Sequence, residues 1–169
     1  MKTIYIARHA STKPALENQH DTERPLTLKG QGEAQWLGQF LLDQPRPSQI
    51  VTSTAIRARE TSNIVNEILG SELSIEIIPA LYLAPSLQIL KILKSLPDTP
   101  GSLALIGHNP GLSQFLLDIS GDGSNETAIK RIYRGLPPAG LAILESKVDS
   151  WQDISQENTT LLNLLHPGE

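Results

Sequence analysis

Residues 3–9 read Thr-Ile-Tyr-Ile-Ala-Arg-His. The first five of these side chains are β-branched, aromatic or small and carry no charge, which predicts a short buried strand at residues 3–7. Arg8 and His9 follow directly. We therefore expect a cation and an imidazole at the point where a buried strand ends.

Outward from this segment, strands and helices are expected to alternate along the chain. Further strands are predicted at residues 49–53, 74–78, 102–107 and 139–145, with a short edge strand at 151–154. Helices are predicted from Thr27 to Leu42, from Thr54 to Leu69, from Ser86 to Leu96 and from Asn109-Pro110 to near Gly121, with loops at 11–26 and 97–101. Thr27, Thr54 and Asn109 are the expected N-caps. The alternation predicts an α/β sandwich with a mostly parallel sheet, and the absence of a repeat or linker predicts one domain over residues 1–169.

Composition narrows the classes of function. A chain of 169 residues with 39% hydrophobic residues suits one domain with its own core. The net charge of −4 argues against nucleic acid as the main partner, and the absence of cysteine excludes disulfides and thiolate chemistry. The start of the chain lacks the pattern of a signal peptide, and no apolar run reaches the ~20 residues of a membrane helix. We expect no membrane association and a cytoplasmic location; the sequence does not indicate an oligomeric state.

Polar residues follow three of the predicted strands. Arg8 and His9 end the first, Ser53 ends the second with Arg57 one turn into the next helix, and His108 ends the fourth. Ligands of open α/β sheets bind beyond the carboxyl ends of the strands, so these residues are expected to converge. Guanidinium groups and a helix N-terminus suit the oxygens of a phosphoryl group.

A histidine in such a pocket could act as a nucleophile. Imidazole is an established covalent nucleophile when it is neutral. Nearby arginines should lower the pKa of His9 by like-charge repulsion and so keep its ring neutral near pH 7.

Simpler explanations exist for each feature taken alone. Arg8 and His9 could lie on the surface, Arg57 and Arg59 could form a solvated helix face, and His108 could belong to an ordinary helix start. A zinc site is disfavoured, because no two histidines have close ligand spacing and the arginines would repel a metal ion. His20 and His166 lie in polar segments that are typical of the surface.

Four segments together resemble the motifs of the histidine phosphatase superfamily. They are Ile4-Tyr-Ile-Ala-Arg-His-Ala10, Arg24-Pro-Leu-Thr-Leu-Lys-Gly30, Ser53-Thr-Ala-Ile-Arg-Ala-Arg-Glu-Thr61 and Leu105-Ile-Gly-His-Asn-Pro-Gly111. The short chain, the His-Asn-Pro-Gly form and the stretch 136–145 followed by Trp151 are similar to its SixA-like branch, the phosphohistidine phosphatases.

The resemblance implies a fold and a set of roles. The fold would be the three-layer α/β/α sandwich of the phosphoglycerate mutase-like proteins. His9 would become phosphorylated, and Arg8, Arg57 and His108 would hold the phosphoryl oxygens. Arg24, Asn109 and Ser11 are further candidates for substrate binding, and no metal or cofactor is required.

The chain departs from the family pattern at three places. Ala10 replaces the usual glycine, which tests whether the backbone there needs a positive φ, and Thr54 replaces the usual proline. The third departure is at Pro79-Ala-Leu-Tyr-Leu-Ala-Pro85, which lacks the carboxylate that acts as general acid in the mutases and phosphoesterases.

The missing acid bears on the substrate. An alkoxide is about as basic as hydroxide, whose parent water has a pKa of ~15.7, and a general acid contributes about 10²–10⁴-fold to its departure. A phosphohistidine can leave as neutral imidazole, whose conjugate acid has a pKa of ~6.5, without such help. We therefore expect a protein-phosphohistidine phosphatase acting on a phosphorylated protein.

Two alternatives remain open. One is a phosphatase of the same superfamily that acts on a small phosphoester or anhydride. The other is a non-catalytic phosphate-binding module, which the retention of both His9 and His108 disfavours. A mutase is less compatible with so short a chain.

Overall fold

A mixed sheet forms the centre of the molecule. The computed structural model describes residues 1–99 and 101–169, and within that part six strands form one sheet in the order β3-β2-β4-β1-β5-β6. The strands are β1 (Lys2–Arg8), β2 (Gln49–Thr52), β3 (Ser74–Ile77), β4 (Ser102–Gly107), β5 (Leu141–Ser146) and β6 (Thr159–Leu165). The pairs from β3 through β2 and β4 to β1 are parallel, whereas β5 and β6 are antiparallel to their neighbours.

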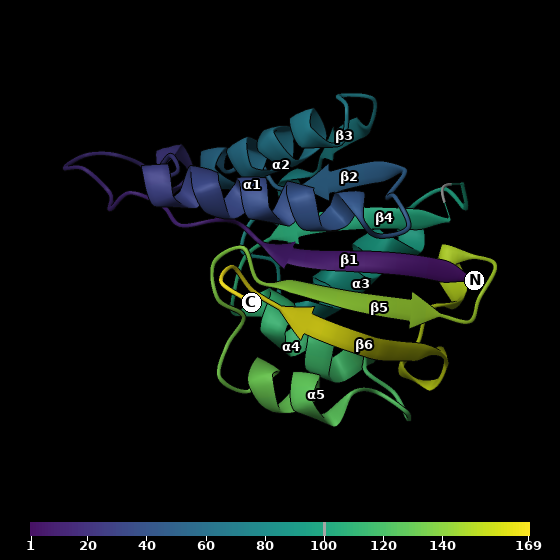
Figure 1. The fold of residues 1–169 in the computed structure, drawn as a ribbon. Helices are drawn as coiled ribbons and strands as arrows, with labels where there is room; N and C mark the ends of the chain where they lie inside the picture. Colours follow the sequence, from purple (N-terminus) through teal and green to yellow (C-terminus); the bar gives the residue numbers. More distant parts are fainter. Residues whose placement is uncertain (100) are drawn as a thin grey trace.

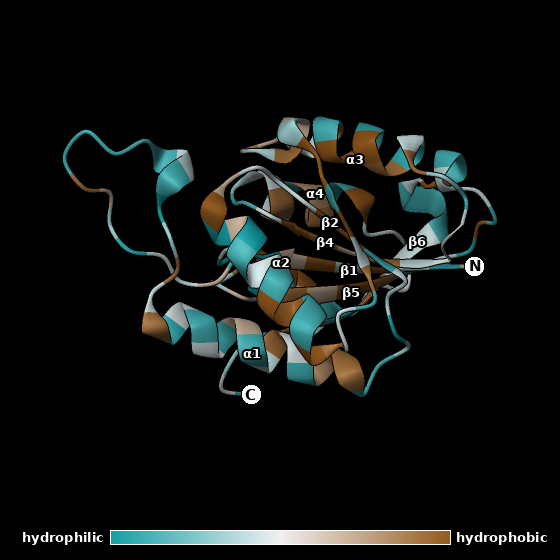
Figure 2. Ribbon diagram, turned by 90° about the horizontal axis from the view of Figure 1, so that it is seen from above, coloured by the Kyte–Doolittle hydropathy of each residue, from teal (hydrophilic) through white to brown (hydrophobic). Residues whose placement is uncertain are grey.

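Helices cover both faces of this sheet. They are α1 (Leu28–Leu42), α2 (Ile56–Ile68), α3 (Ser86–Ser95), α4 (Gly111–Ile119) and α5 (Glu126–Ile132). Figure 2 shows the sheet edge-on, with α1 and α2 below it and α3 and α4 above it. Their hydrophobic faces turn toward the sheet, and no helix in the described part of the chain is long and apolar enough to cross a membrane. The predicted three-layer α/β/α sandwich is confirmed.

The alternation of side chains along β1 explains the two cores. Tyr5 and Ala7 pack with buried residues of α1 and α2, whereas Ile4 and Ile6 pack with those of α3 and α4. Successive side chains of a strand point to opposite faces, so one apolar strand supplies both layers. This double burial is why residues 3–7 read as a continuous apolar run.

The parallel half of the sheet determines where the polar residues gather. Arg8 pairs in register with Gly107, and Thr52 pairs with Ile106. The carboxyl ends of β1, β2 and β4 therefore meet at one edge. The loop of residues 11–26 extends beyond this edge in Figure 1.

Two of the predicted helix caps are wrong. Helix α2 has Ala55 as its N-cap and starts at Ile56, so Thr54 does not cap it. Helix α4 starts at Gly111 with Pro110 as its N-cap. The Asn109 side chain instead donates from Nδ2 to the Leu136 carbonyl at 2.9 Å, because the chain returning at Leu136 lies within its reach.

The C-terminal third differs most from expectation. Residues Trp151–Asp153 form a 3₁₀ turn rather than an edge strand, and the outer strand on that side is β6. Trp151 and Ile154 are apolar because they are buried in the core under α3, not because they pair in a sheet. Helix α5 was not predicted, and the expected loop at 97–101 includes residue 100, which lies outside the described residues.

Candidate active site

Residues from three strand ends meet in one pocket. The rings of His9 and His108 lie 5.1 Å apart between centroids, although the two residues are far apart in sequence. Both are buried, with 8% and 2% of their surfaces exposed. The pocket has a volume of about 370 Å³ and is lined by Arg8, His9, Thr12, Asp21, Arg24, Arg57, Tyr82, Leu83, His108 and Asn109.

The hydrogen bonds of His9 define which ring nitrogen carries the proton. Nδ1 lies 2.8 Å from the Ala10 carbonyl oxygen, which can only accept, so Nδ1 carries the hydrogen. Nε2 therefore keeps its lone pair, and Arg57 donates to it from Nε at 3.2 Å. Burial, together with the charges of Arg57, Arg8 and Arg24, lowers the pKa of His9 to about 4. The ring is neutral at pH 7, as a nucleophilic imidazole must be.

The backbone next to His9 accommodates alanine without strain. Ala10 is fully buried, and its φ is not in the positive range. Its N–H donates to Oγ1 of Thr61 at 3.1 Å, so the threonine of the Ser53–Thr61 motif fixes the strand end from α2. The departure from the family glycine at this position therefore costs nothing in backbone conformation.

His108 is held from the neighbouring strand. Its Nε2 lies 2.5 Å from Oγ of Ser53, and the Tyr82 ring meets it edge-on at 5.5 Å between centroids. Burial, with smaller contributions from His9 and Arg57, lowers the pKa of His108 to about 3. Nδ1 of His108 and Nε of Arg8 have no hydrogen-bond partner among the described residues.

Arg57 lies between the nucleophile candidate and a carboxylate. It is 3% exposed, and its guanidinium donates to His9 from Nε, to the Asp21 carbonyl from Nη1 at 2.6 Å and to Oδ2 of Asp21 from Nη2 at 2.8 Å. Burying a guanidinium is costly unless its donors are satisfied, and here all three nitrogens have partners. Because Arg57 points into the pocket, the alternative that it lies on a solvated face of the helix is excluded.

Asp21 and Tyr82 belong to the site, and the sequence did not indicate them. Asp21 accepts from the Tyr82 hydroxyl at 2.6 Å and from Arg24 at 2.9 Å, besides Arg57. The hydroxyl of Tyr82, together with Arg24 and Arg57, holds the pKa of the Asp21 carboxyl well below its usual range. Tyr82 lies in the segment 79–85, where the absence of a carboxylate gives no sign of a role for a tyrosine, and Asp21 lies in a loop whose sequence carries no signal beyond its closeness to Arg24.

The remaining predicted residues divide into two groups. Arg24 and Asn109 line the pocket, and Arg24 is fixed by bonds to the Lys13 carbonyl and to Thr12. Ser11 is not among the lining residues. Its hydroxyl donates to Glu33 at 2.9 Å and its N–H to the same carboxylate at 2.7 Å, so Thr12 takes its place at the pocket.

The segment Arg24–Gly30 holds this loop in position. Thr27 caps α1 by accepting from the Gly30 N–H at 2.9 Å, as predicted. A Cβ atom on Gly30 would lie 2.0 Å from the Ser11 carbonyl oxygen, so only glycine allows α1 to pack this closely against the loop after His9. The motif therefore positions the backbone next to the pocket as well as supplying Arg24.

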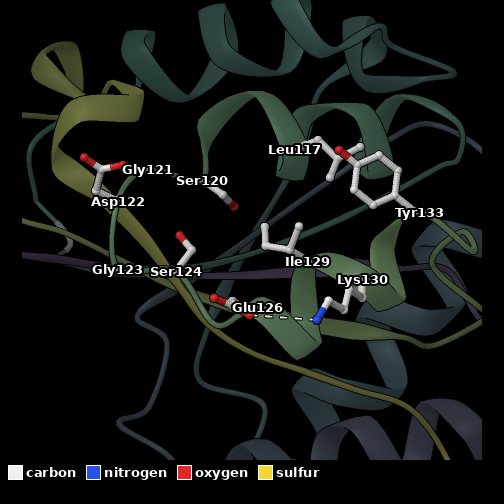
Figure 3. A pocket seen from close by; sticks show the side chains of 10 residues that line it. All are labelled: Leu117, Ser120, Gly121, Asp122, Gly123, Ser124, Glu126, Ile129, Lys130 and Tyr133. Carbon is white, nitrogen blue, oxygen red and sulfur yellow. Dashed lines mark ion pairs between the residues drawn. The ribbon is translucent and has the colours of Figure 1, made fainter.

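A larger hollow lies elsewhere on the surface and lacks this chemistry. It has a volume of about 540 Å³ and is formed by α4, α5 and the loop between them (Figure 3). Lys130, the one cation among its lining residues, is paired with Glu126 at 3.8 Å, and Asp122 adds another negative charge. This lining does not suit a phosphoryl group. Among the described residues, no group of three or more His, Cys, Asp or Glu side chains is placed to hold a metal ion.

Comparisons with known proteins agree with the geometry. Residues 4–82 match the family model of the histidine phosphatase superfamily (branch 1), a range that includes His9, Arg24 and Arg57. The chain belongs to the histidine phosphatase superfamily. It is therefore a phosphatase, and the interpretation as a non-catalytic phosphate-binding module is set aside.

Relatives of this histidine phosphatase lie in the SixA-like branch. Two solved structures assigned as the phosphohistidine phosphatase SixA each superpose with a TM-score of 0.81. The one from Nakamurella multipartitia is 25% identical and covers 99% of this chain and 97% of its own. The one from Agrobacterium tumefaciens is 27% identical and covers 98% of both. The uncharacterized protein ML1117 of Mycobacterium leprae (strain TN) is 30% identical over 143 residues, 84% of this chain and 86% of that protein.

Proposed function

We propose that this histidine phosphatase removes the phosphoryl group of a protein phosphohistidine through a covalent phosphohistidine on His9. The observation that carries the proposal is the neutral Nε2 atom of His9, which faces a guanidinium inside a pocket shared with His108. A lone pair next to fixed cations is the arrangement that in-line attack on a phosphoryl group requires.

The chemistry proceeds in two displacements. In the first, the Nε–H of Arg57 turns from Nε2 of His9 to a phosphoryl oxygen, and the freed Nε2 lone pair forms a bond to phosphorus. The phosphorus–nitrogen bond of the substrate breaks with its electron pair remaining on the departing imidazole. In the second, water attacks the phosphorus of the phosphoenzyme. Inorganic phosphate is released and Nε2 regains its lone pair.

Arg8, Arg57 and His108 are assigned to the phosphoryl oxygens. Arg57 already lies within hydrogen-bond distance of the nucleophile, so an oxygen on a phosphoryl group bound to His9 would be within its reach. Arg8 and His108 each retain a buried nitrogen without a partner among the described residues, and both line the pocket. Such positioned donors supply most of the rate in phosphoryl transfer. Arg24 and Asn109 also line the pocket, whereas Ser11 does not and is assigned no role in binding.

The substrate class follows from the acid that the pocket lacks. Asp21 is the one carboxylate among the described lining residues, and its pKa is held low, so it is ionised and has no proton to give. Without a general acid, a leaving group that departs as neutral imidazole is favoured over an alkoxide. The likeness to proteins assigned as SixA points the same way.

The test uses a phosphohistidine-bearing protein domain as substrate. We expect the wild-type enzyme to release its phosphate and His9→Ala to be inactive, while His20→Ala, a change at an exposed histidine, keeps the wild-type rate. Equal slow release by wild type and His9→Ala would refute the nucleophile. A strong preference for sugar phosphates or nucleotides over phosphohistidine would favour the small-molecule alternative.

The proposal retains three further expectations from the sequence. The reaction is metal-independent, the enzyme acts in the cytoplasm, and residues 1–169 form one domain. Activity in the presence of a chelator tests the first, localisation of a tagged chain tests the second, and a single cooperative unfolding transition tests the third.

A further inference from the structure

The mechanism proposed above leaves one pair of pocket groups unused. Asp21 and Tyr82 lie in the lining and are joined by a hydrogen bond of 2.6 Å. An ionised carboxylate can only accept, so the Tyr82 hydroxyl donates its hydrogen to Asp21. What these two groups offer to a ligand is therefore only lone pairs, and we call them the acceptor pair.

The acceptor pair stands out against the rest of the lining. Arg8, Arg24 and Arg57 are donors that cannot accept, and they suit phosphoryl oxygens. A negative carboxylate repels a phosphoryl dianion, so Asp21 is poorly suited to that part of the substrate. Its chemistry suits a part that carries a hydrogen-bond donor or a positive charge.

The acceptor pair lies next to the reacting centre. Nε and Nη2, which share one edge of the Arg57 guanidinium, donate to Nε2 of His9 and to Oδ2 of Asp21 respectively. The Asp21 carboxylate and the nucleophilic Nε2 atom of His9 therefore bind to adjacent nitrogens of the same guanidinium. Tyr82 contacts the same centre, with its ring 5.9 Å from Cζ of Arg57 and edge-on to His108.

The fold holds Tyr82 at this position by a close backbone contact. A Cβ atom on Gly111 would lie 1.8 Å from the Ala84 carbonyl oxygen, so glycine allows the start of α4 to lie directly against the segment that carries Tyr82. Asp21 is fixed from other directions by Arg24 and Arg57. Both members of the pair are therefore positioned before substrate binds.

The chemistry of the leaving group explains what the pair could recognise. A phosphoimidazole that is protonated on its distal nitrogen loses its phosphorus–nitrogen bond to give neutral imidazole, with the electron pair on the proximal nitrogen and the N–H still on the distal one. A ring without that proton would have to leave as the far more basic imidazolide anion. An acceptor at the distal N–H keeps the proton in place until the bond breaks.

We propose that Asp21 and Tyr82 form the leaving-group subsite, where they accept a hydrogen bond from the distal N–H of a phosphoimidazole and so select N–P substrates over phosphate esters. This inference rests on the proposed function. Asp21 and Tyr82 would then determine the specificity of the enzyme, which should discriminate against leaving groups that carry their own negative charge.

The test compares two substrates on matched variants. Phosphoimidazole leaves with an N–H, whereas p-nitrophenyl phosphate leaves as a phenolate that needs neither a proton nor an acceptor. The readout is the ratio of kcat/KM on phosphoimidazole to kcat/KM on p-nitrophenyl phosphate, because any loss from a displaced Arg57 affects both substrates and cancels. We expect this ratio to fall about 10–100-fold in Asp21→Asn, the range expected for a hydrogen bond to a charged group, and by less in Tyr82→Phe.

The control is Asp43→Asn, which removes a charge from the exposed C-terminal cap of α1 and should leave the ratio unchanged. A ratio unchanged in both Asp21→Asn and Tyr82→Phe would overturn the inference and leave only a positioning role for Asp21. A loss in Asp21→Asn that is largest on an alkyl phosphate would also overturn it, because Asp21 would then be a proton donor. The wild-type rate on phosphoimidazole reports separately on the proposed function, since it does not depend on either variant.

Discussion

Arg57 donates a hydrogen bond from Nε to Nε2 of His9 across 3.2 Å. This hydrogen bond orients the ring in the free enzyme and is released when the Nε2 lone pair attacks phosphorus, and the charge of Arg57 helps to lower the pKa of the same ring. One side chain thus orients the nucleophile and adds to the burial that keeps it neutral. The pairing also explains why Arg57 is almost completely buried although it carries a charge.

Replacement of Arg57 by lysine should disable the enzyme. An ammonium group cannot donate to His9 and Asp21 at the same time with the geometry of a planar fork. We expect Arg57→Lys to lower kcat/KM on p-nitrophenyl phosphate about 10²–10³-fold, the loss that follows removal of one fixed donor to a developing charge. Arg59→Lys, at an exposed position of the same helix, is the control and should retain full activity. A wild-type rate in Arg57→Lys would show that the bidentate arrangement has no role.

The hydroxyl of Ser53 should matter through His108. Its Oγ lies 2.5 Å from Nε2 of His108, and we expect it to hold that ring in place. Ser53→Ala should reduce kcat/KM by about 5–10-fold, equivalent to one hydrogen bond of ~1 kcal/mol. Ser62→Ala removes another buried hydroxyl, which donates to the Ala58 carbonyl within α2, and serves as the control. Equal activity of the two variants would show that His108 does not depend on Ser53.

Two glycines in α1 offer a contrast in stability. A Cβ atom on Gly30 would lie 2.0 Å from the Ser11 carbonyl oxygen, whereas a Cβ atom on Gly32 would meet nothing within 4 Å. Gly30→Ala should lower the free energy of unfolding by about 3 kcal/mol or more, because backbone must move. Gly32→Ala should raise it by about 0.5–1 kcal/mol, because alanine is favoured over glycine in a helix interior. Urea denaturation measures both, and a neutral Gly30→Ala would contradict the close approach of α1 to the loop after His9.

Stability should fall as the pH is lowered from 7 to 5. The pKa values of His9 and His108 are about 4 and about 3 in the folded chain, against ~6.5 for an unfolded histidine. In this window the unfolded chain binds more protons than the folded chain, so the free energy of unfolding decreases by about 1–2 kcal/mol per histidine. The Asp21 carboxyl is ionised in both states there, because its pKa is held low in the folded chain and an unfolded aspartate has a pKa of ~3.9, below this window.

Variants assign this pH dependence to its source. The difference in unfolding free energy between pH 7 and pH 5 should shrink in His9→Asn and stay the same in His20→Asn, since His20 is exposed. A difference that is the same in wild type and His9→Asn would mean that His9 is not held neutral by burial.

The sequence predicted the elements that position the site because their signals are local. The strand predicted from the apolar run at residues 3–7 and the Thr27 cap are confirmed. A strand buried on both faces is a continuous apolar run, and a capping threonine lies three residues before the N–H that it accepts from, so both patterns are visible within a few residues of sequence. The same holds for the strand at 102–107 that brings His108 to His9. Convergence of three strand ends then follows from parallel pairing.

The sequence did not predict features that depend on distant contacts. Tyr82 and Asp21 are 61 residues apart and meet only because the loop of residues 11–26 folds over the sheet edge. Asn109 could cap a helix by its type, but the Leu136 carbonyl offers it a partner from another part of the chain. Strand β6 (Thr159–Leu165) was missed because its leucines do not alternate cleanly, and its pairing with β5 contains an irregularity after Ile143.

Trapping the phosphoenzyme tests the central claim most directly. The enzyme is mixed with phosphoimidazole, quenched within the first turnover in alkali, which preserves phosphohistidine, and analysed by peptide mass spectrometry. The account predicts one phosphoryl group on Nε2 of His9, absent from His9→Ala and accumulated more strongly when hydrolysis is slowed. Phosphate release from the wild-type enzyme without any phosphorylated His9, or with the label on another residue, would contradict it.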